Sequence, residues 1–376
     1  MKKILFVCQS LKIGGAERMQ VTLANKLVEA GYDVTILIWL PIYTLQDDLD
    51  KRVHLIYKAP DEHLGNKIPY IRHKYYDDCM WEMRATPKQL YRYYVGNTDY
   101  DVEICFFHAI ALDIIAGSTN PKSKKIAWVH HNVEERGLER DLQKTKELYH
   151  QIGNIVCVSN SARDSFLKVF GDTGNVRVIY NMLPIDEITA KANEPTKQVF
   201  RKSGFHIVQV ARFDSLKGYQ RLIETVVKLR QEEKELSLAL VGAGEEKPHM
   251  LDMIQQTNAQ DYIFVVDGET NPYCYIKEAD LLVCASYTEG YNLSVAEALI
   301  LGVPVLSTDC AGPSEILDYG RYGMLVENSE EGLYDGLKAL YESPSLLEEY
   351  RQKAVQRQDF FDEDAILDQI IDVIEG

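Results

Sequence analysis

The sequence predicts an α/β fold built from two doubly wound parallel-sheet domains in tandem. Short, continuously apolar runs recur along the whole chain, and a turn and a stretch of helical periodicity follow most of them. Such runs are typical of strands that are buried on both faces of a parallel sheet. The length of 376 residues suits two domains of ordinary size. The alternation of strands and helices therefore predicts one parallel sheet in each half of the chain.

The predicted domain boundary lies near the middle of the chain. Residues 187–203 are polar with weak periodicity, which is typical of a linker. We therefore expect an N-terminal domain over residues 1–186 and a C-terminal domain over residues 204–355. A final helix is expected over residues 356–376.

The composition argues against several classes of protein. A net charge of −16 and a pI of about 5.1 make nucleic acid an unsuitable partner. The seven cysteines are scattered and form no C-x-x-C pair, so we expect buried thiols in a reducing, cytoplasmic compartment rather than disulfides or metal ligands. No apolar run approaches the length of a transmembrane helix, and the apolar stretch at the N-terminus is too short for a secretory signal.

The two halves of the chain differ in charge. Residues 1–190 contain 24 basic and 24 acidic side chains, whereas residues 191–376 contain 17 and 33. The second half is strongly acidic and an anionic membrane surface would repel it. A peripheral contact with the inner face of a membrane would therefore be made by the first half. The tyrosine-rich stretch 67–94, with interleaved basic residues, would suit a lipid headgroup surface or a sugar acceptor. The alternative, which we favour, is a set of helices packed on the sheet with half-buried tyrosines.

The N-terminal domain is expected to begin with a strand over 4–8, a helix over 16–30 and a second strand over 34–39. The pair Gly14-Gly15 precedes the helix, and glycine lets the backbone approach a ligand where free amide groups favour an anion. The chain contains no G-x-G-x-x-G sequence, so a nicotinamide dinucleotide site is not indicated.

Histidines follow two of the later strands of this domain. Further strands are expected over 102–107, 125–129, 155–158 and 176–180. In doubly wound sheets, ligands bind beyond the carboxyl ends of the strands. His130 and His131 follow the second of these strands and His108 follows the first, so all three are candidates for a site, with His130 preferred.

Two cations follow the first strand of the C-terminal domain. This strand is expected over 206–210, and Arg212 and Lys217 lie in the turn after it. An arginine fork and a lysine point charge at that position suit a diphosphate. The other strands of the domain are expected over 238–241, 263–266, 281–284, 303–306 and 323–326.

Two acids frame the loop that follows the strand over 281–284. Glu289 precedes the helix expected over 293–301, and Glu297 lies in its second turn. Backbone amides in the loop and the first helical turn lack intrahelical partners and form an anion site. These amides belong to Gly290, Tyr291, Asn292 and Leu293. Carboxylates on either side of that anion could accept hydrogen bonds from sugar hydroxyl groups.

These two motifs together resemble a known family. The acid-framed loop has the pattern S-x-x-E-G-x6-E-A-L-x-x-G-x-P-V, and the cation loop has the pattern A-R-x4-K-G with Ala211 in place of a glycine. Both are similar to motifs of the retaining glycosyltransferases of family 4. The resemblance covers nearly the whole chain and implies the GT-B fold, in which two Rossmann-like domains face a cleft. In this fold the last helix, here 356–376, often crosses back onto the first domain.

The resemblance implies a role for each motif. It assigns the donor diphosphate to Arg212 and Lys217, the donor sugar to Glu289, and the ribose hydroxyls to Glu297. Gly242 would lie near the nucleoside.

It also implies roles in the first domain. W-V-H-H-N would place His130, or failing that His131, beside the reacting sugar carbon. G-G-A-E-R, with Gly14 and Gly15, would reach the donor phosphates or the acceptor. The segment that ends this domain departs from the family pattern, because Met182 replaces a glycine, so no role is carried over to Asp186.

The implied function is transfer of a hexose or N-acetylhexosamine from a nucleotide-sugar donor, taken as UDP-linked, to a saccharide or lipid-linked saccharide acceptor in polysaccharide or glycolipid synthesis. The transfer would retain the anomeric configuration and use neither a metal nor a cofactor, since the two cations offset the charge of the leaving group. The resemblance does not exclude a GDP-linked or an ADP-linked donor. The alternatives are an isomerase resembling UDP-sugar 2-epimerases and a non-catalytic partner subunit of a glycosyltransferase complex.

Overall fold

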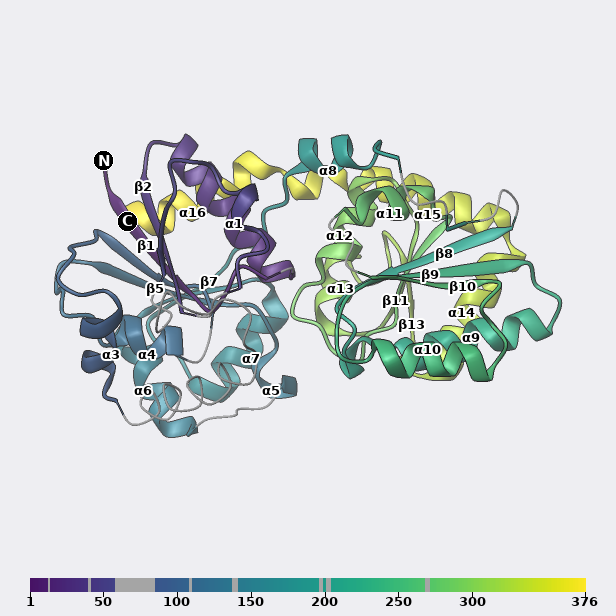
Figure 1. Cartoon of the computed structure of the whole chain (residues 1–376), viewed down its shortest axis with the longest axis horizontal. Helices are drawn as coiled ribbons and strands as arrows, with labels where there is room; N and C mark the ends of the chain where they lie inside the picture. Colours follow the sequence, from purple (N-terminus) through teal and green to yellow (C-terminus); the bar gives the residue numbers. More distant parts are fainter. Residues whose placement is uncertain are drawn as a thin grey trace, which may run out of the picture. The chain divides into compact units, whose positions relative to one another are not determined.

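The computed structural model describes residues 1–12, 14–39, 42–57, 85–107, 110–136, 141–195, 199–200, 204–267 and 271–376. The chain divides into two compact units. Unit 1 consists of Met1–Tyr180 and Leu367–Gly376, and unit 2 consists of Asn181–Ile366. Each unit contains one parallel sheet with helices on both faces (Figure 1), which confirms the predicted fold class.

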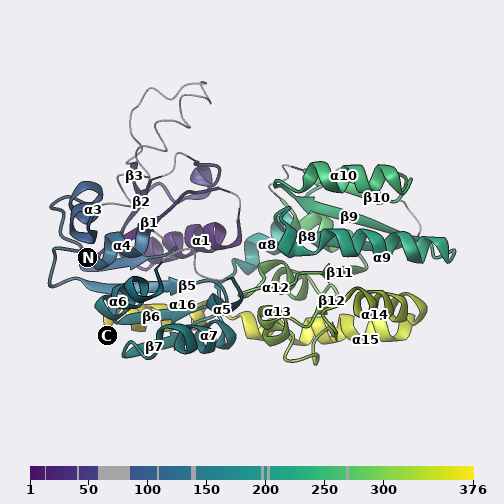
Figure 2. The ribbon, with the colours of Figure 1, turned by 90° about the horizontal axis from the view of Figure 1, so that it is seen from below.

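Unit 1 has a sheet of seven parallel strands within the described residues, in the order β3-β2-β1-β4-β5-β6-β7. Figure 2 shows this order from one edge of the sheet to the other, with β3, β2 and β1 towards the upper edge and β5, β6 and β7 towards the lower edge. The strands are β1 (Lys3–Cys8), β2 (Asp33–Ile38), β3 (His54–Tyr57), β4 (Val102–Cys105), β5 (Lys124–Val129), β6 (Asn154–Cys157) and β7 (Asn175–Val178).

The helices of unit 1 bury an apolar core against both faces of the sheet. The helices are α1 (Gly15–Glu29), η1 (Gln46–Asp48), α3 (Pro87–Tyr94), α4 (Ile110–Ala116), α5 (Val133–Arg136), α6 (Leu142–Ile152) and α7 (Asn160–Phe170). One core cluster joins α3, α4, α6 and α7 to the sheet. The C-terminal helix α16 (Glu363–Glu375) ends in this unit, where Glu375 accepts a hydrogen bond of 2.8 Å from Tyr32 and pairs with Lys2 at 2.7 Å.

Unit 2 has a sheet of six parallel strands within the described residues, in the order β10-β9-β8-β11-β12-β13. The strands are β8 (Phe205–Val210), β9 (Leu236–Gly242), β10 (Ile263–Asp267), β11 (Leu281–Cys284), β12 (Val305–Thr308) and β13 (Met324–Val326). The central strands β8 and β11 are neighbours, and the chain winds outward from them in opposite directions. Ligands of doubly wound sheets bind at such a switch point, beyond the carboxyl ends of the strands.

The helices of unit 2 cover both faces of its sheet (Figure 1). They are α8 (Ile185–Lys191), η2 (Ser215–Lys217), α9 (Tyr219–Gln231), α10 (Lys247–Gln256), α11 (Tyr273–Glu278), α12 (Leu293–Ile300), α13 (Ala311–Ile316), α14 (Glu330–Glu342), α15 (Pro344–Gln356) and η3 (Gln358–Phe361). α9, α10 and α14 share one apolar core on one face. α8, α11 and α12 contact one another on the other face.

Part of the stretch 187–203, expected as a linker, is helical. Helix α8 begins at Ile185, and its Ile188 is fully buried. Asn271 donates a hydrogen bond of 2.9 Å to the carbonyl of Lys191, which fixes the end of the helix on unit 2. The division between the units lies between Tyr180 and Asn181, ahead of this helix rather than at residue 186.

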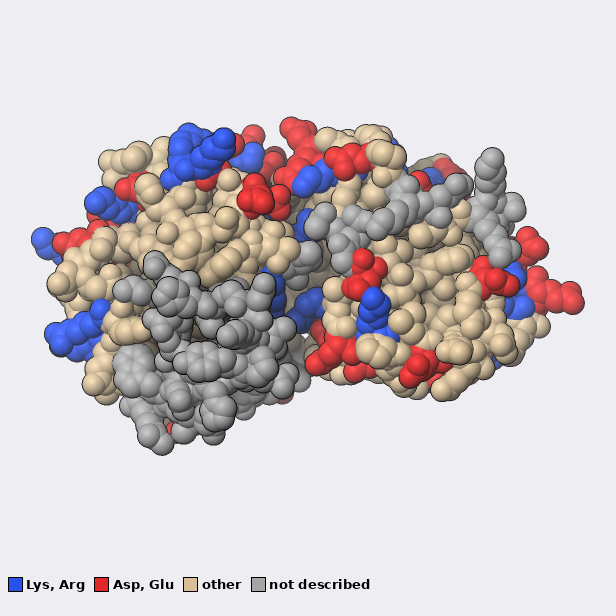
Figure 3. All heavy atoms as spheres, in the orientation of Figure 1, with Lys and Arg blue, Asp and Glu red and all other residues tan. Residues whose placement is uncertain are grey.

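Most of the tyrosine-rich stretch 67–94 lies outside the described residues, up to residue 84. In the described part, α3 buries Tyr91 and Tyr94 and leaves Tyr93 half-exposed. On the face drawn in Figure 3, basic and acidic side chains are interspersed over the described part of both units. Among the described residues no helix combines the length and apolarity needed to cross a bilayer. The six described cysteines are buried, as expected, and within the described residues none of them is joined in a disulfide.

Candidate active site

An ion pair joins the two loops at the switch point of unit 2. Lys217 ends η2 after β8, and Glu289 lies in the loop after β11. Lys217 Nζ donates to Glu289 Oε1 at 2.8 Å, and the two side chains are only 15% and 10% exposed. Burial alone would lower the pKa of Lys217, but the charge and hydrogen bond of Glu289 outweigh burial, so the pKa is raised. Lys217 is therefore a cation at neutral pH.

Glu289 is held by three donors on a single oxygen. Besides Lys217, Ser286 Oγ donates to Glu289 Oε1 at 2.7 Å and Asn292 Nδ2 donates at 2.9 Å. In the part of the chain that the structure describes, no hydrogen bond reaches Oε2. One carboxylate oxygen is thus used to fix the side chain, and the other can accept a hydrogen bond from a ligand.

Asn292 links this carboxylate to the start of α12. Its φ of 85° lies in the left-handed region, which asparagine tolerates better than most residues. Its Oδ1 accepts from the amide of Val295 at 3.0 Å, so the side chain caps the helix while its Nδ2 holds Glu289. Leu293 begins the helix, as the sequence predicted.

Tight backbone packing supports the rest of the loop. The amide of Gly312 donates to the carbonyl of Glu289 at 3.3 Å. A Cβ on Gly312 would lie 2.5 Å from the carbonyl oxygen of Tyr291, so only glycine fits there. Gly290 is half-buried and Tyr291 is buried. Glu297 lies in the second turn of α12 and is 5% exposed.

The structure does not bring Arg212 into the ion pair. Arg212 is half-exposed, and its Nη2 lies 3.3 Å from Asp214 Oδ2. Asp214 also accepts from the amide of Leu216 at 3.1 Å and so caps η2. Gly242 ends the neighbouring strand β9, and a Cβ there would lie 2.0 Å from the carbonyl of Ala211. Glycine at 242 therefore allows β9 to end directly beside the start of the Arg212 loop.

The candidate residues of unit 1 lie at the carboxyl ends of β1 and β5. Gly14 caps α1 and Gly15 is its first residue. A Cβ on Gly14 would lie 2.3 Å from Glu17 Oε2, so the buried side chain of Glu17 fills the space that the glycine leaves. Glu17 was not singled out from the sequence, although an acid in a first helical turn after two glycines is a visible signal.

Aromatic rings surround the histidine that follows β5. The His130 ring lies 4.6 Å from the ring of Phe106 and stacks on Phe107 at 5.8 Å. His131 follows it and is half-buried. β4 lies between β1 and β5 in the sheet, so the glycine loop and His130 are two strands apart, about 10 Å. His108 lies outside the described residues.

Sequence reasoning missed several side chains around the ion pair. It assigned Asn292 through its backbone amide, whereas the side chain binds Glu289. Ser286 was treated as part of a polar turn. Both residues lie three positions from Glu289, and this spacing is the only signal that the sequence offers for them.

Comparisons with known proteins identify the family of the chain. The family described as "Glycosyltransferase Family 4" matches residues 13–187, and the family described as "Glycosyl transferases group 1" matches residues 190–357. An uncharacterized glycosyltransferase of Haemophilus influenzae is 25% identical over 92% of both chains. An N-acetylgalactosamine-N,N'-diacetylbacillosaminyl-diphospho-undecaprenol 4-alpha-N-acetylgalactosaminyltransferase of Campylobacter jejuni is 29% identical over 49% of both chains.

Among solved structures, Anabaena Alr3699/HepE in complex with UDP and glucose is similar over 100% of both chains, with a TM-score of 0.79 and 18% sequence identity. This likeness supports the fold. The two family matches together span nearly the whole chain, the first mostly in unit 1 and the second within unit 2. The chain therefore belongs to the GT-B glycosyltransferases of family 4 and group 1, and it is a transferase enzyme.

Proposed function

We propose that the protein transfers a hexose or N-acetylhexosamine from a UDP-linked donor to a hydroxyl group of a saccharide or lipid-linked saccharide acceptor, with retention of the anomeric configuration. The observation that carries the proposal is the largely buried Lys217–Glu289 pair beside the N-terminus of α12. A cation, a fixed carboxylate and the N-terminus of a helix at one switch point suit a sugar attached to a diphosphate.

The residues around the pair supply the electrostatic part of the reaction. Lys217 offsets the negative charge that develops on the leaving diphosphate, and the exposed Arg212 can turn from Asp214 to bind it as a fork. The amides at the start of α12 add further donors. Glu289, held through Oε1, orients the donor sugar by accepting from a hydroxyl group at Oε2. Glu297 accepts from the ribose hydroxyls.

Retention follows from attack on the same face of the sugar that the diphosphate leaves. The bond between the anomeric carbon and the phosphate oxygen breaks, and the acceptor oxygen bonds to that carbon. The departing phosphate oxygen takes the proton of the acceptor hydroxyl group. Glu289 acts as an orienting group rather than as a nucleophile in this scheme, because Lys217, Ser286 and Asn292 hold it in place.

We also propose that transfer needs no divalent metal, since Lys217 and Arg212 provide the positive charge that a metal would otherwise supply. Activity measured after treatment with EDTA should equal that of the untreated enzyme. A loss of activity that added Mg²⁺ or Mn²⁺ restores would contradict this part of the proposal.

The choice of donor and acceptor takes support from similar proteins. The Campylobacter jejuni relative is named for transfer of N-acetylgalactosamine to a saccharide on diphospho-undecaprenol. The Anabaena structure contains UDP and glucose. We therefore expect a UDP-sugar donor and a saccharide acceptor, with a lipid-diphosphate-linked saccharide as the first acceptor to test. The product would contribute to a cell-surface polysaccharide or glycolipid.

The test is a transfer assay with the purified chain. UDP-glucose, UDP-galactose and their N-acetylated forms are offered beside GDP-mannose and ADP-glucose, with an undecaprenyl-diphosphate disaccharide as acceptor. Mass spectrometry detects the extended acceptor, and NMR reports the anomeric configuration. Transfer from a UDP-sugar with retention supports the proposal. An inverted product, or epimerisation of UDP-N-acetylglucosamine without any acceptor, would overturn it.

A further inference from the structure

One buried side chain joins the two loops that carry the ion pair. Gln209 lies on β8 and is 2% exposed. Its Nε2 donates to the carbonyl of Lys217 at 2.9 Å, and its Oε1 accepts from the amide of Ala285 at 3.2 Å. β8 and β11 pair at Ile207 and Val208, so Gln209 and Ala285 lie just beyond the paired residues. The side-chain amide therefore continues the connection between the strands where the backbone pairing ends.

A buried arginine holds the other side of Ala285. Arg221, on α9, is 1% exposed. Its Nε and Nη2 donate to the carbonyl of Ala285 at 2.9 and 2.6 Å, and Nη2 also donates to Asn328 Oδ1 at 2.8 Å. The guanidinium stacks over the ring of Tyr287, 3.8 Å from its centroid. Gln209 and Arg221 thus bind the amide and the carbonyl of the same residue, four positions before Glu289.

The partners of Arg221 are neutral, although the group is a buried cation. Among the described residues, no carboxylate lies within ion-pair distance of its guanidinium. Burial lowers the pKa of Arg221. A buried charge without an opposite charge costs several kcal/mol. The two hydrogen bonds to the Ala285 carbonyl give this cation a function, which is to hold the backbone at Ala285 in a fixed position.

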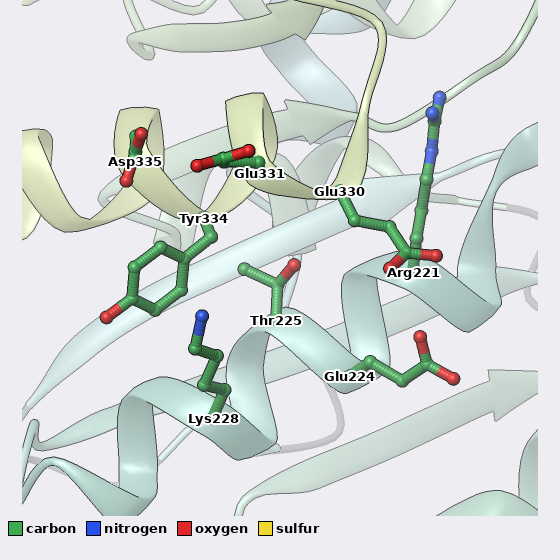
Figure 4. Close-up of a pocket in the computed structure, with 8 residues that line it drawn as sticks. All are labelled: Arg221, Glu224, Thr225, Lys228, Glu330, Glu331, Tyr334 and Asp335. Carbon is green, nitrogen blue, oxygen red and sulfur yellow. The ribbon is translucent and has the colours of Figure 1, made fainter.

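Arg221 borders a surface pocket, but its guanidinium does not point into that pocket. This pocket, of about 430 Å³, lies between α9 and α14. Figure 4 shows the Arg221 guanidinium turned away from Thr225, Lys228 and Tyr334, which line the same pocket. The stem of Arg221 lines the pocket, and its charged end is used at Ala285.

Gly218 completes the enclosure of the Ala285 carbonyl. Its φ of +65° is left-handed. A Cβ on Gly218 would lie 1.9 Å from the Ala285 oxygen and 2.8 Å from Arg221 Nε. Only glycine allows this approach, so the residue after Lys217 packs directly against the residue that leads to Glu289.

We propose that Gln209 and Arg221 are positioning residues, which fix the Glu289 loop against the Lys217 loop and so maintain the geometry of the ion pair during transfer. The inference rests on the proposed function of that pair. Neither residue touches the donor in this scheme. Both act through the backbone at Ala285, and Gln209 acts also through the backbone of Lys217.

The first test replaces the joining side chain. Gln209→Met removes both hydrogen bonds and keeps a similar volume. We expect kcat to fall about 10- to 100-fold, because a small displacement of catalytic groups has effects of this size, while the donor KM changes little. The carbonyl of Lys217 and the amide of Ala285 lose a partner, so the melting temperature should fall by a few degrees in a protein that stays folded in the assay. The matched control is Gln220→Met, which alters an exposed glutamine on α9 and should keep full activity. Undiminished kcat in Gln209→Met would overturn the proposal.

The second test separates charge from geometry at Arg221. Arg221→Met replaces a buried cation by an apolar side chain, a change that cores often tolerate. We expect the variant to fold and to lose kcat, and we expect Arg221→Lys to retain more activity because it can still donate to the Ala285 carbonyl. Equal losses in both, together with lowered melting temperatures, would indicate a purely structural role and contradict the proposal.

A crystal structure of Gln209→Met gives a result that does not depend on activity. The proposal expects Lys217 Nζ and Glu289 Oε1 to move out of hydrogen-bond distance, and an unchanged 2.8 Å contact would overturn it. If the wild-type enzyme transfers no sugar from any donor, the proposed function fails, and this structure still decides whether Gln209 positions the pair.

Discussion

The six strands of unit 2 follow the same order as the first six strands of unit 1, but the two units place their candidate groups differently around the switch point. In unit 2, Lys217 and Glu289 follow the adjacent strands β8 and β11, and the two side chains are in contact. In unit 1, the glycine loop follows β1 and His130 follows β5, with β4 between them. Adjacent strands can bring two loops into direct contact, whereas loops two strands apart leave room for a ligand. The same fold therefore supplies a charged pair in one unit and separate groups in the other.

The chemical character of the two sites differs as well. The described part of the unit 2 site contains a lysine and a carboxylate that are 15% and 10% exposed and an arginine that is buried, connected by hydrogen bonds through the loop backbone. The described neighbours of His130 include the rings of Phe106 and Phe107. We expect substitutions in the unit 2 site to slow departure of the leaving group, and therefore to lower kcat equally with every acceptor. We expect the loss of kcat caused by substitutions in the unit 1 site to depend on the acceptor.

The largest expected effect comes from breaking the ion pair. Lys217→Ala and Glu289→Gln should each lower kcat about 10²- to 10³-fold, since removal of one group that stabilises developing charge typically has this effect. The matched control is Lys228→Ala, an exposed lysine on α9 that lies over the ring of Tyr334. Transfer assays with saturating donor measure the loss. Near-normal turnover in either variant would remove the basis for assigning the leaving-group chemistry to unit 2.

A smaller effect is expected in unit 1. His130→Ala should lower kcat about 100-fold, the low end of the range for positioned proton-transferring groups. His150→Ala, an exposed histidine on α6, is the control. Assays with two different acceptors would sharpen the contrast between the units, because the ratio of the two rates should change in His130→Ala and stay constant in Lys217→Ala. If the ratio of the rates with the two acceptors stayed constant in both variants, the proposed functional difference between the units would be wrong.

The next effect concerns binding rather than turnover. Glu297→Ala should raise the donor KM about tenfold, as expected for a lost hydrogen bond to a charged group, and should leave kcat nearly unchanged. Glu297→Gln keeps an acceptor oxygen and should raise KM less. Initial rates over a range of donor concentrations give both constants. An unaltered KM in the alanine variant would rule out the ribose role.

The fold could be predicted because buried parallel strands are continuous apolar runs, and Leu281–Cys284 is one of them. The contact between Lys217 and Glu289 could not, since 72 residues separate them and only the order of the strands makes their loops neighbours. Arg212 and Lys217 looked equivalent in the sequence, but Asp214 two residues after Arg212 pairs with it at the surface. In the sequence, Arg221 is an ordinary polar residue of a helix. Its role at Ala285 becomes visible only in the structure, where the side chain is buried and donates to that carbonyl.

The smallest expected effect compares two carboxylates, one in each unit. Glu103 on β4 is fully buried and accepts a hydrogen bond of 2.7 Å from Tyr91, and burial raises its pKa in spite of that bond and the charge of Lys125. Glu289 has a lysine in direct contact, whereas Glu103 is held by a neutral hydroxyl group.

Because the folded-state pKa of Glu103 is raised, the native state binds more protons than the unfolded state between the two pKa values. The contribution of Glu103 to stability is therefore complete below its ordinary pKa of 4.5 and is lost as the pH rises through the folded-state value. Glu103→Gln should remove this dependence and still accept from Tyr91. Thermal melts of both proteins at a series of pH values below and above 4.5 should show a gap that moves in favour of the variant as the pH rises, by about 2–4 °C for each 1 kcal/mol. A gap that is independent of pH would show that the pKa of Glu103 is the same in the folded and the unfolded protein, and would contradict the expected shift.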